Sequence, residues 1–453
     1  MVKNSNRVKK TNQKAWVVTV DMGYGHQRAA YPLRHLSPTD KVVIANNYEG
    51  IPRKDRRIWE NSRKFYEYVS RLTSLPLIGQ KIFDFYDRKF QSIPDFYPKR
   101  DLSKSIFQIN QTYKMIRKGW GKDLVEYLNT KNLPLISTFF IPAFMAEEHG
   151  FKNDIYCVVC DADISRNWVA KDPKKSKIKY LAPCRRVVAR LKLYGVPEEN
   201  IFLTGFPLPV ENLGNNNVEI LKKDLGERII NLDPEHRYRT KYVSTIKQFL
   251  GSKFKEKEKH DHPLTLTFAV GGAGAQRKLA KQILLSLKDR LLKQELNLNL
   301  VAGSRNDVYG FFKDEIENIG LKKILNKNLA IIFDIQKEEY FKKFNVALKT
   351  TDILWTKPSE LSFYTALGLP IIMAPTIGAQ ETYNRAWLRG VGGGLIQDNP
   401  KHTSEWLFDW INSGWLAEAS MSGFLDGRQF GVDNIKKIVF EGMKEPAKNY
   451  QLL

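Results

Sequence analysis

The stretch "AWVVTVDMGYGHQRAAYPL", residues 15–33, joins a β-branched apolar segment to a glycine-containing turn and then to an alanine-rich segment. A second stretch with the same plan, "TFAVGGAGAQRKLA", occupies residues 267–280. Each predicts a buried strand, a tight turn and the start of a helix, which is the repeating unit of a parallel sheet covered by helices. One such start in each half of the chain predicts two doubly wound α/β domains.

Strand-like segments continue through both halves and alternate with helix-like ones. They are "AWVVTV", "KVVIANN", "LPLIST", "IYCVVC", "IKYLAP" and "NIFLTG" in the first half, then "LTLTFAV", "LNLNLVAG", "LAIIFDI" and "LPIIMAP" in the second. Short apolar strands separated by helices indicate parallel sheets with both faces covered. A chain of 453 residues is long enough to build two such cores.

Composition shifts suggest where the domains divide. Prolines open "FPLPVENLGNNNVE" (206–219), so we expect a hinge near residue 210, and the charged "SKFKEKEKHDH" (252–262) precedes the first strand of the second domain. The expected division is a disordered basic tail (1–14), a first domain (15–210), a hinge with linker helices (211–262), a second domain (263–435) and a C-terminal helix and tail (436–453).

A long basic and aromatic insertion, at about residues 50–130, interrupts the first domain where about a dozen residues would make a normal crossover. In "FYEYVSRLTSLPLIGQKIFDFYDRKF" (65–90), apolar side chains recur at helical spacing with Lys and Arg among them. This pattern is typical of helices at a membrane interface. The alternative is that the apolar faces pack on the sheet.

The composition is that of an ordinary globular protein, with 42% hydrophobic and 27% charged residues. The net charge of +23 indicates anionic partners such as acidic lipid, nucleotide phosphates or nucleic acid, unless it only solvates the surface. No segment reaches the roughly 18 apolar residues of a membrane span, and no signal-peptide segment follows the basic start. We therefore expect a cytoplasmic protein.

The C-x-x-C formed by Cys157 and Cys160 does not indicate a metal or redox site. It lies in the predicted strand "DIYCVVC", where positions three apart point to opposite faces.

Ligands of doubly wound folds bind beyond the carboxyl ends of the strands, so the turns there are the candidate site. The first turn contains Gly23 and Gly25, with His26 at the start of the helix, but it lacks the third glycine of dinucleotide-binding turns. On this pattern alone His26 is either a structural histidine or a functional one.

The second domain opens with a turn that can hold phosphate on backbone N–H groups at a helix start, because it contains Gly271, Gly272 and Gly274. Arg305 follows the next strand on the same rim. Further polar side chains surround the strand "PIIMAP", namely Lys357, Ser359, Glu360, Ser362, Gln380, Glu381 and Asn384. So many polar groups beside a buried strand indicate a polar ligand.

Taken in order, these motifs resemble the GT-B glycosyltransferases that include the monogalactosyldiacylglycerol synthases and the processive diacylglycerol glucosyltransferases, and more distantly the lipid I N-acetylglucosaminyltransferase. The similar segments are "GYGHQRAA", "VVCDADISRNWVAKDP", "ARLKLYGVPEENIFLTGFPL", "AVGGAGAQ", "AGSRN" and "GLPIIMAPTIGAQETYN". They span roughly residues 15 to 390. The chain departs from the family at Asp21, Met22 and Tyr24, where small residues are usual, and near Phe363, where the family has its ribose-binding Glu.

The resemblance implies two Rossmann-like domains facing a central cleft. It also implies an inverting transfer of sugar from a nucleotide donor, expected to be UDP-linked, to a lipid such as diacylglycerol at the inner face of the membrane. His26 would be the catalytic base, with Asp161 as the second candidate or as the group that orients it. No metal and no further cofactor would be required, because N–H groups and cations stabilise the leaving diphosphate.

The resemblance also implies where the substrates bind. The acceptor would meet the turn of Gly23, Tyr24 and Gly25. Glu360 or a neighbour would hold the ribose, and Gln380 and Glu381 the sugar hydroxyls. The full expected donor set is Gly271, Gly272, Gly274, Gln276, Arg305, Phe333, Ile335, Lys357, Ser359, Glu360, Gln380, Glu381 and Asn384.

Three alternatives stay open at this point. One is a nucleotide-sugar epimerase of the same fold, which would need no basic aromatic insertion. Another is a glycosyltransferase with a soluble acceptor. A non-catalytic binder of nucleic acid or other polyanions is disfavoured, because no nucleic-acid-binding motif is present and the glycine turns would be unexplained. Which sugar is moved, whether transfer repeats, and the oligomeric state are not encoded in these patterns.

Overall fold

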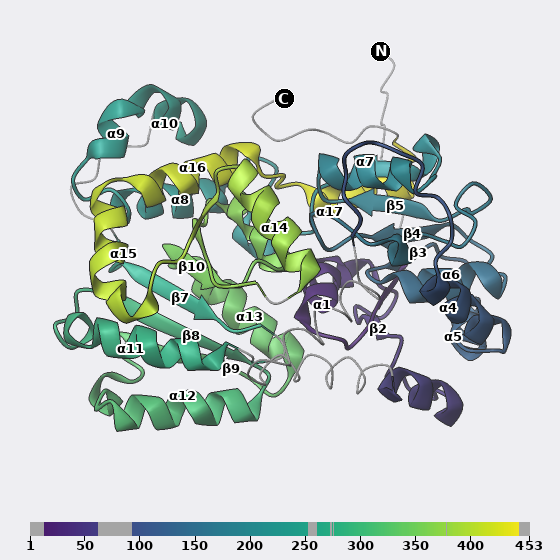
Figure 1. Ribbon diagram of the computed structural model, residues 1–453, viewed down its shortest axis with the longest axis horizontal. Coiled ribbons are helices and arrows are strands. Elements are labelled where there is room, and N and C mark those ends of the chain that lie inside the picture. The colour runs from purple at the N-terminus through teal and green to yellow at the C-terminus, as the bar shows by residue number, and fades with distance from the viewer. Residues whose placement is uncertain are drawn as a thin grey trace, which may run out of the picture.

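The computed structural model describes residues 13–61, 93–251, 261–271, 274, 276–376 and 378–443. These residues form two parallel sheets of six strands each, covered by helices and lying side by side (Figure 1). The predicted fold class is therefore confirmed: two doubly wound, Rossmann-like domains, which is the GT-B architecture.

The first sheet has the strand order β2-β1-β3-β4-β5-β6. Its strands are β1 (Trp16–Thr19), β2 (Val43–Ile44), β3 (Leu135–Ser137), β4 (Ile155–Val158), β5 (Lys179–Ala182) and β6 (Ile201–Leu203). Its helices are α1 (Tyr24–Ala30), α4 (Phe107–Arg117), α5 (Lys122–Leu128), α6 (Phe140–Glu148) and α7 (Arg185–Leu193), with 3₁₀ turns at Tyr31–Leu36, Arg166–Trp168 and Glu198–Asn200. The strand order reverses between β1 and β3, and a ligand crevice is expected at that point.

The second sheet has the order β12-β11-β10-β7-β8-β9, which is the Rossmann order read from the other edge. Its strands are β7 (Thr265–Ala269), β8 (Asn297–Gly303), β9 (Leu329–Phe333), β10 (Ile353–Thr356), β11 (Ile371–Met373) and β12 (Gly394–Ile396). The helices are α11 (Arg277–Leu292), α12 (Asn306–Asn318), α13 (Lys337–Leu348), α14 (Ala379–Gly390), α15 (Thr403–Asn412) and α16 (Trp415–Asp426), with 3₁₀ helices at Lys322–Ile324, Glu360–Leu367 and Pro400–His402. Here the order reverses between β7 and β10.

The segment between the domains is helical and is anchored on the second domain. It contains a 3₁₀ turn at Val210–Asn212 and the helices α8 (Glu219–Asn231), α9 (Arg237–Lys241) and α10 (Val243–Leu250). The buried guanidinium of Arg228 in α8 donates hydrogen bonds to the carbonyls of Thr351 (2.8 Å) and Leu367 (2.9 Å). These bonds satisfy carbonyls at the ends of elements of the second domain.

The last helix of the described chain crosses back to the first domain (Figure 1). This helix, α17 (Gly431–Glu441), buries Val432, Ile435 and Ile438 in one apolar cluster with residues of β1, β3, β4 and β5. The start of the helix passes so close to the hinge that a Cβ at Gly431 would lie 2.1 Å from the carbonyl oxygen of Phe206. Packing against the first sheet therefore begins at Gly431.

The described part of the insertion packs on the first domain. The segment that includes α4 and α5 buries Ile116, Trp120, Leu124 and Leu128 in the main core, and Trp120 lies 4.8 Å from Trp59 between ring centres. Its apolar face is thus used within the domain. Residues 62–92, which carry most of the pattern expected at a membrane interface, lie outside the described residues, as does the tail up to residue 12.

Every strand-like segment quoted from the sequence contains a strand, although "KVVIANN" forms only two residues of one. Two strands, β10 and β12, are absent from the sequence-based set. The strand β10 is short, and its segment "ILWTKP" is followed at once by polar residues, so the pattern of the loop hides it. The strand β12 lies at the sheet edge and follows glycines.

Candidate functional site

His26 lies at the point where the strand order of the first sheet reverses. Its Nδ1 is 2.9 Å from the carbonyl oxygen of Thr138, just beyond β3. A carbonyl only accepts hydrogen bonds, so Nδ1 carries the proton and Nε2 keeps its lone pair. The ring packs against Phe139 and Trp168, with centre distances of 4.7 and 5.9 Å. Burial lowers the pKa of His26 to about 4, although the bond to Thr138 opposes this, so the imidazole is neutral at physiological pH.

Asp161 follows β4 on the same edge of the sheet. Burial raises the pKa of this carboxyl to about 6, and the negative charges of Glu360 and Glu381 act in the same direction. A hydrogen bond from Asn384 and the charge of Lys357 partly offset the rise. Asp161 therefore titrates near pH 6, and a carboxyl with a pKa raised in this way is a candidate functional group.

Asp163 has a structural role. Its carboxylate is buried and pairs with Arg186 (2.7 Å) and Arg190 (2.8 Å). Asp161 and Asp163 form the sequence D-A-D, but they are not two equivalent, unpaired carboxylates, because Asp163 is engaged by the two arginines. Within the ranges that the structure describes, no group of three or more His, Cys, Asp or Glu side chains is placed to hold a metal ion.

In the second domain, Lys357 follows β10 and lies over the first glycine of the turn after β7. A Cβ at Gly271 would come within 2.3 Å of Cε of Lys357. The ammonium pairs with the carboxylate of Glu381 at the start of α14. Gly274 adopts φ +67° and donates from its N–H to the carbonyl of Gly271 at 2.8 Å, which makes the turn tight. Gly272 lies outside the described residues.

Glu360 points away from its own domain and toward α1. Its Oε1 lies 3.0 Å from Nε of Arg28; the arginine side chain is buried and that of Glu360 is 11% exposed. A Cβ at Gly25 would be 3.3 Å from the other carboxylate oxygen, so the glycine turn approaches Glu360 closely. The predicted ribose-binding carboxylate therefore contacts the first domain.

Asn384 joins the domains through both ends of its amide. Its Oδ1 accepts from the N–H of Ala162 at 2.7 Å, and its Nδ2 donates to Asp161 at 3.0 Å and to the carbonyl of Pro358 at 3.4 Å. The side chain is fully buried. In this conformation the amide serves the interface between the domains.

Two residues of the first turn that differ from the resembled family, Tyr24 and Asp21, also contact the second domain. The hydroxyl of Tyr24 accepts from the N–H of Ser304 at 2.7 Å, and its ring lies where a side chain at Gly303 would be. Asp21 pairs with Lys337 at the start of α13. In Figure 1 the helix α1 accordingly lies between the two sheets. No local pattern in the sequence predicts that Tyr24 and Asp21 contact the second domain.

The other predicted donor residues lie around this centre. Gln276 donates to the carbonyl of Pro375 at 2.7 Å. Arg305 lies near Gly274 and pairs with Asp307 at 3.0 Å. Phe333 stacks on Tyr309, and Ile335 is 66% exposed at the end of β9. Ser359 and Gln380 lie at the starts of the 3₁₀ helix after β10 and of α14. Five of the predicted site residues therefore lie close together: Lys357, Glu360, Glu381, Asn384 and Asp161. Phe333, Ile335 and Arg305 lie apart from them, at the ends of β8 and β9.

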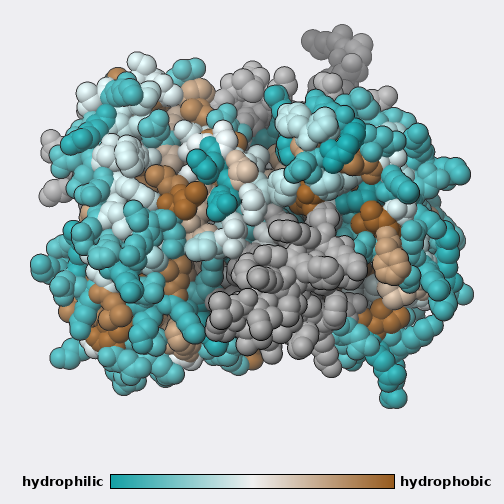
Figure 2. Space-filling model, viewed as in Figure 1, coloured by the Kyte–Doolittle hydropathy of each residue, from teal (hydrophilic) through white to brown (hydrophobic). Residues whose placement is uncertain are grey.

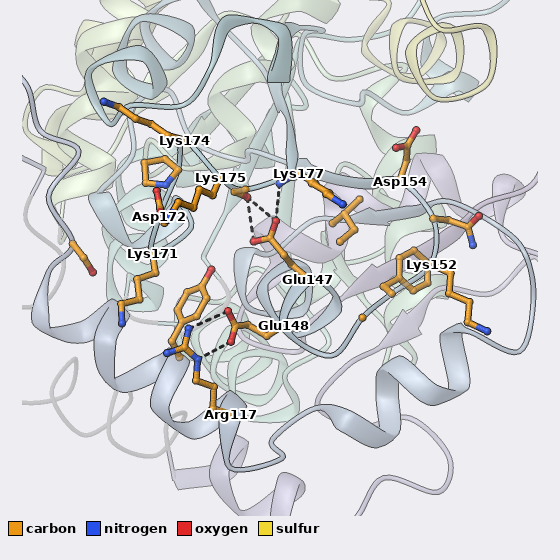
Figure 3. A pocket seen from close by; sticks show the side chains of 18 of the residues that line it. Arg117, Glu147, Glu148, Lys152, Asp154, Lys171, Asp172, Lys174, Lys175 and Lys177 are labelled. Atoms are coloured by element: carbon orange, nitrogen blue, oxygen red, sulfur yellow. Dashed lines mark hydrogen bonds and ion pairs between the residues drawn. The ribbon is translucent and has the colours of Figure 1, made fainter.

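A cavity of about 1300 Å³ lies elsewhere in the first domain, between the end of α6, α4 and the loop 171–177 (Figure 3). Glu147 there accepts from Ser176 Oγ at 2.9 Å and from the N–H of Lys177 at 2.7 Å, and Arg117 pairs with Glu148 at 2.8 Å. This cavity is at the amino ends of β4 and β5, away from the edge that carries His26. Its chemistry is a mixture of lysines and carboxylates, and it is a different site from the one predicted.

Two more properties bear on the site. The cysteines at 157, 160 and 184 are free and buried, and burial raises the pKa of the Cys157 thiol, so none resembles a reactive thiolate. Over the described ranges, no helix is both long and apolar enough to cross a membrane. The described surface in Figure 2 is mostly hydrophilic, with small hydrophobic patches on both domains.

No protein-family model matches the sequence, and no curated protein matches it. Solved structures do align with the chain. MurG of Acinetobacter baumannii aligns over 95% of this chain and 100% of its own, with 13% identity and a TM-score of 0.44. The complex of S. aureus MnaA with UDP aligns over 76% and 85%, with 12% identity and a TM-score of 0.44. The UDP-GlcNAc 2-epimerase of Neisseria meningitidis, bound to UDP-GlcNAc, aligns over 76% and 82%, with 13% identity and a TM-score of 0.43. Likeness at this level carries no argument about activity.

Proposed function

We propose that this protein is an inverting glycosyltransferase that moves a sugar from a nucleotide donor, UDP-linked, to a hydroxyl of a membrane lipid such as diacylglycerol. The observation that carries the proposal is His26: a neutral imidazole whose Nδ1 proton is fixed by the Thr138 carbonyl and whose Nε2 retains its lone pair. Such a group can take a proton from an acceptor hydroxyl. It lies on a turn that contacts the polar residues of the second domain.

The proposed step is a single displacement. The acceptor oxygen forms a bond to the anomeric carbon of the sugar while the bond from that carbon to the diphosphate oxygen breaks. The hydroxyl proton goes to Nε2 of His26, and the electron pair leaves with the diphosphate. Lys357 and the N–H groups of the turn after β7 supply positive partners for the leaving group, since both lie at the same strand ends.

Glu381 and Lys357 are placed to exchange partners when a donor binds. In the structure the ammonium of Lys357 pairs with Glu381. A diphosphate is the stronger partner for an ammonium, so its arrival frees the carboxylate to accept hydrogen bonds from sugar hydroxyls. This exchange gives Glu381 the donor-sugar role that the sequence suggests without requiring a second cation.

The lipid acceptor and the membrane surface are supported by the net charge of +23 and by the basic aromatic pattern of the insertion. The localisation that follows is the cytoplasmic face of a membrane, as a peripheral protein. A nucleotide-sugar epimerase is the second candidate function, because a site that binds a nucleotide sugar and holds a base and a titrating carboxyl could also serve that reaction.

The first experiment is a thermal-stability screen of UDP, UDP-sugars and other nucleotide sugars, because a ligand that binds the folded chain raises its melting temperature. A transfer assay with diacylglycerol vesicles then compares the wild type with His26→Gln. We expect at least a hundredfold loss of transfer with UDP binding retained. His35→Gln is the matched control, since His35 also bonds a carbonyl through Nδ1, at 2.9 Å to Pro32, but lies away from the cleft-facing turn.

The outcomes separate the candidates. Near-normal transfer by His26→Gln would make His26 structural. Conversion of a UDP-sugar to its epimer without any acceptor would favour the epimerase. Displacement of UDP by RNA or DNA at comparable concentration would favour a polyanion binder.

A further inference from the structure

We infer that Arg28 is a positioning residue that fixes the catalytic base His26 relative to the donor-binding residue Glu360. This inference rests on the proposed function. Arg28 belongs to α1, two residues after His26, yet its guanidinium extends to the second domain, where Nε lies 3.0 Å from Oε1 of Glu360. Its side chain is 3% exposed. A buried arginine on a short alanine-rich helix is costly unless its charge is used.

The surroundings of Arg28 hold it in one place. The guanidinium carbon lies 4.5 Å from the ring centre of Phe344 and between 5.3 and 5.7 Å from those of Tyr24, Tyr340 and Phe341. One terminal nitrogen also donates to the hydroxyl of Tyr340. Three of the four rings belong to α13, so the cation is held by the second domain on two sides.

The geometry of α1 links this contact to the base. Residues two apart on an α-helix differ by about 200° around its axis, so His26 and Arg28 point to nearly opposite sides. His26 is hydrogen-bonded to Thr138 of the first domain, and Arg28 forms an ion pair with Glu360 of the second. A helix of seven residues is too short to bend between them. The position of the base relative to the donor carboxylate is therefore set in part through Arg28, beside the contacts that Tyr24 and Asp21 make with the second domain.

The ion pair of Arg28 with Glu360 also balances charge in the site. Glu360 lies in a group of carboxylates with Asp161 and Glu381, whose charges influence one another. Lys357 pairs with Glu381, and Arg28 pairs with Glu360. Without Arg28, the carboxylate of Glu360 would lose its counter-ion and would turn toward solvent. It would then no longer present a fixed acceptor to the donor ribose.

The test compares Arg28→Gln, Arg28→Lys, Glu360→Gln and the double variant Arg28→Gln/Glu360→Gln, with Arg34→Gln as control. Arg34 is close in sequence but donates to the carbonyl of Tyr31 within its own segment, at 2.8 Å. We expect Arg28→Gln to lower kcat for transfer at least tenfold while the acceptor KM stays within about threefold. Arg28→Lys should restore part of the rate, and the double variant should be no slower than the slower single one, because both changes remove the same pair.

A second readout does not depend on transfer. Hydrogen exchange at the amides of residues 24–30 should slow when UDP binds the wild type and the Arg34→Gln control, and should not respond in Arg28→Gln, which must still show a UDP-induced rise in melting temperature. If α1 exchange in UDP-bound Arg28→Gln slows as in the wild type, or if kcat stays within twofold, the inference is wrong. If UDP binds and α1 responds but no lipid is glycosylated, the proposed function is wrong and the coupling by Arg28 stands.

Discussion

Asn384 of the second domain donates a hydrogen bond to Asp161 of the first at 3.0 Å, and the same amide accepts from the backbone of Ala162 at 2.7 Å. This is a contact between a residue that the sequence assigns to donor binding and one that it assigns to the catalytic turn. It shows that the two candidate halves of the site are in direct contact. The bond also offsets part of the rise in the pKa of Asp161 that burial causes.

Replacement of Asn384 should therefore weaken both the domain contact and the site. Asn384→Ala leaves the N–H of Ala162 and the carboxyl of Asp161 without their partner. We expect a loss of about 2 kcal/mol in the free energy of unfolding, the usual cost of unsatisfied buried groups. Urea unfolding measures it, with Asn412→Ala at the exposed end of α15 as control. A loss below 0.5 kcal/mol would mean that water replaces the amide and that the contact is incidental.

The pKa values of His26 and Asp161 predict the pH dependence of transfer. His26 stays neutral down to about pH 4, so it does not limit the rate between pH 5 and 8. Asp161 takes up a proton below about pH 6. We expect kcat/KM to fall about tenfold per pH unit below pH 6, and this limb to disappear in Asp161→Asn, which should be slow but flat. A limb that persists in Asp161→Asn would assign it to another group.

The same carboxyl predicts an effect on stability. The folded pKa of Asp161, about 6, lies above the unfolded value near 3.8, so its ionisation disfavours the fold. Asp161→Asn imitates the neutral carboxyl and still accepts from Asn384. It should melt above the wild type at pH 8, and the difference should vanish below about pH 4, where the carboxyl is neutral in both states. Equal melting temperatures at pH 8 would contradict the burial of Asp161.

How much of the fold and of the candidate site could be predicted from the sequence depends on how far apart along the chain the residues of each feature lie. The strands and the turns at their carboxyl ends are local patterns, and His26, Lys357 and Glu360 do lie in the segments that follow β1 and β10. The pairs Arg28 with Glu360 and Asp161 with Asn384 join positions far apart, and no periodicity predicts them. One local signal was available: a single arginine in "HQRAA", among residues that must be buried, requires a partner.

The same reasoning applies to the bonds of the predicted donor residues, which the sequence does not reveal. Asn384 was assigned through a resemblance that records residue types and not their bonds, and the structure shows its amide engaged by the first domain. Phe333 and Ile335 were expected to belong to the donor site. The carbonyl of Phe333 accepts from Lys343 at 3.2 Å in this conformation, which the local strand pattern does not reveal.

Gly271 gives a steric prediction. A Cβ there would lie 2.3 Å from Cε of Lys357, so Gly271→Ala must displace the lysine and break its pair with Glu381. We expect UDP to bind about tenfold more weakly by calorimetry, equivalent to one lost charge-assisted hydrogen bond. Gly310→Ala on α12 is the control, because a Cβ at Gly310 has open space. In a Lys357→Ala background the Gly271→Ala change should cost no further affinity, and an additional tenfold loss would indicate that the alanine blocks the nucleotide itself.

His262 predicts how the second domain responds to alkaline pH. Its Nε2 lies 3.2 Å from Asp352 and its Nδ1 2.7 Å from Asp261, just before β7. Burial alone would lower the pKa of His262, but the bonds and charges of the two carboxylates outweigh it and raise the pKa to about 9. Because the folded pKa lies above the unfolded value of 6.5, the contribution of His262 to the free energy of unfolding is complete below pH 6.5. This contribution is lost as the pH rises through 9. We expect His262→Gln to lose about 1 to 2 kcal/mol at pH 6.5 after allowance for solvent screening, and nothing at pH 10, as measured by urea unfolding. The same substitution at the exposed His402 is the control for the loss of an imidazole at the surface, and a pH-independent loss at His262 would mean that the side chain acts by packing and not by charge.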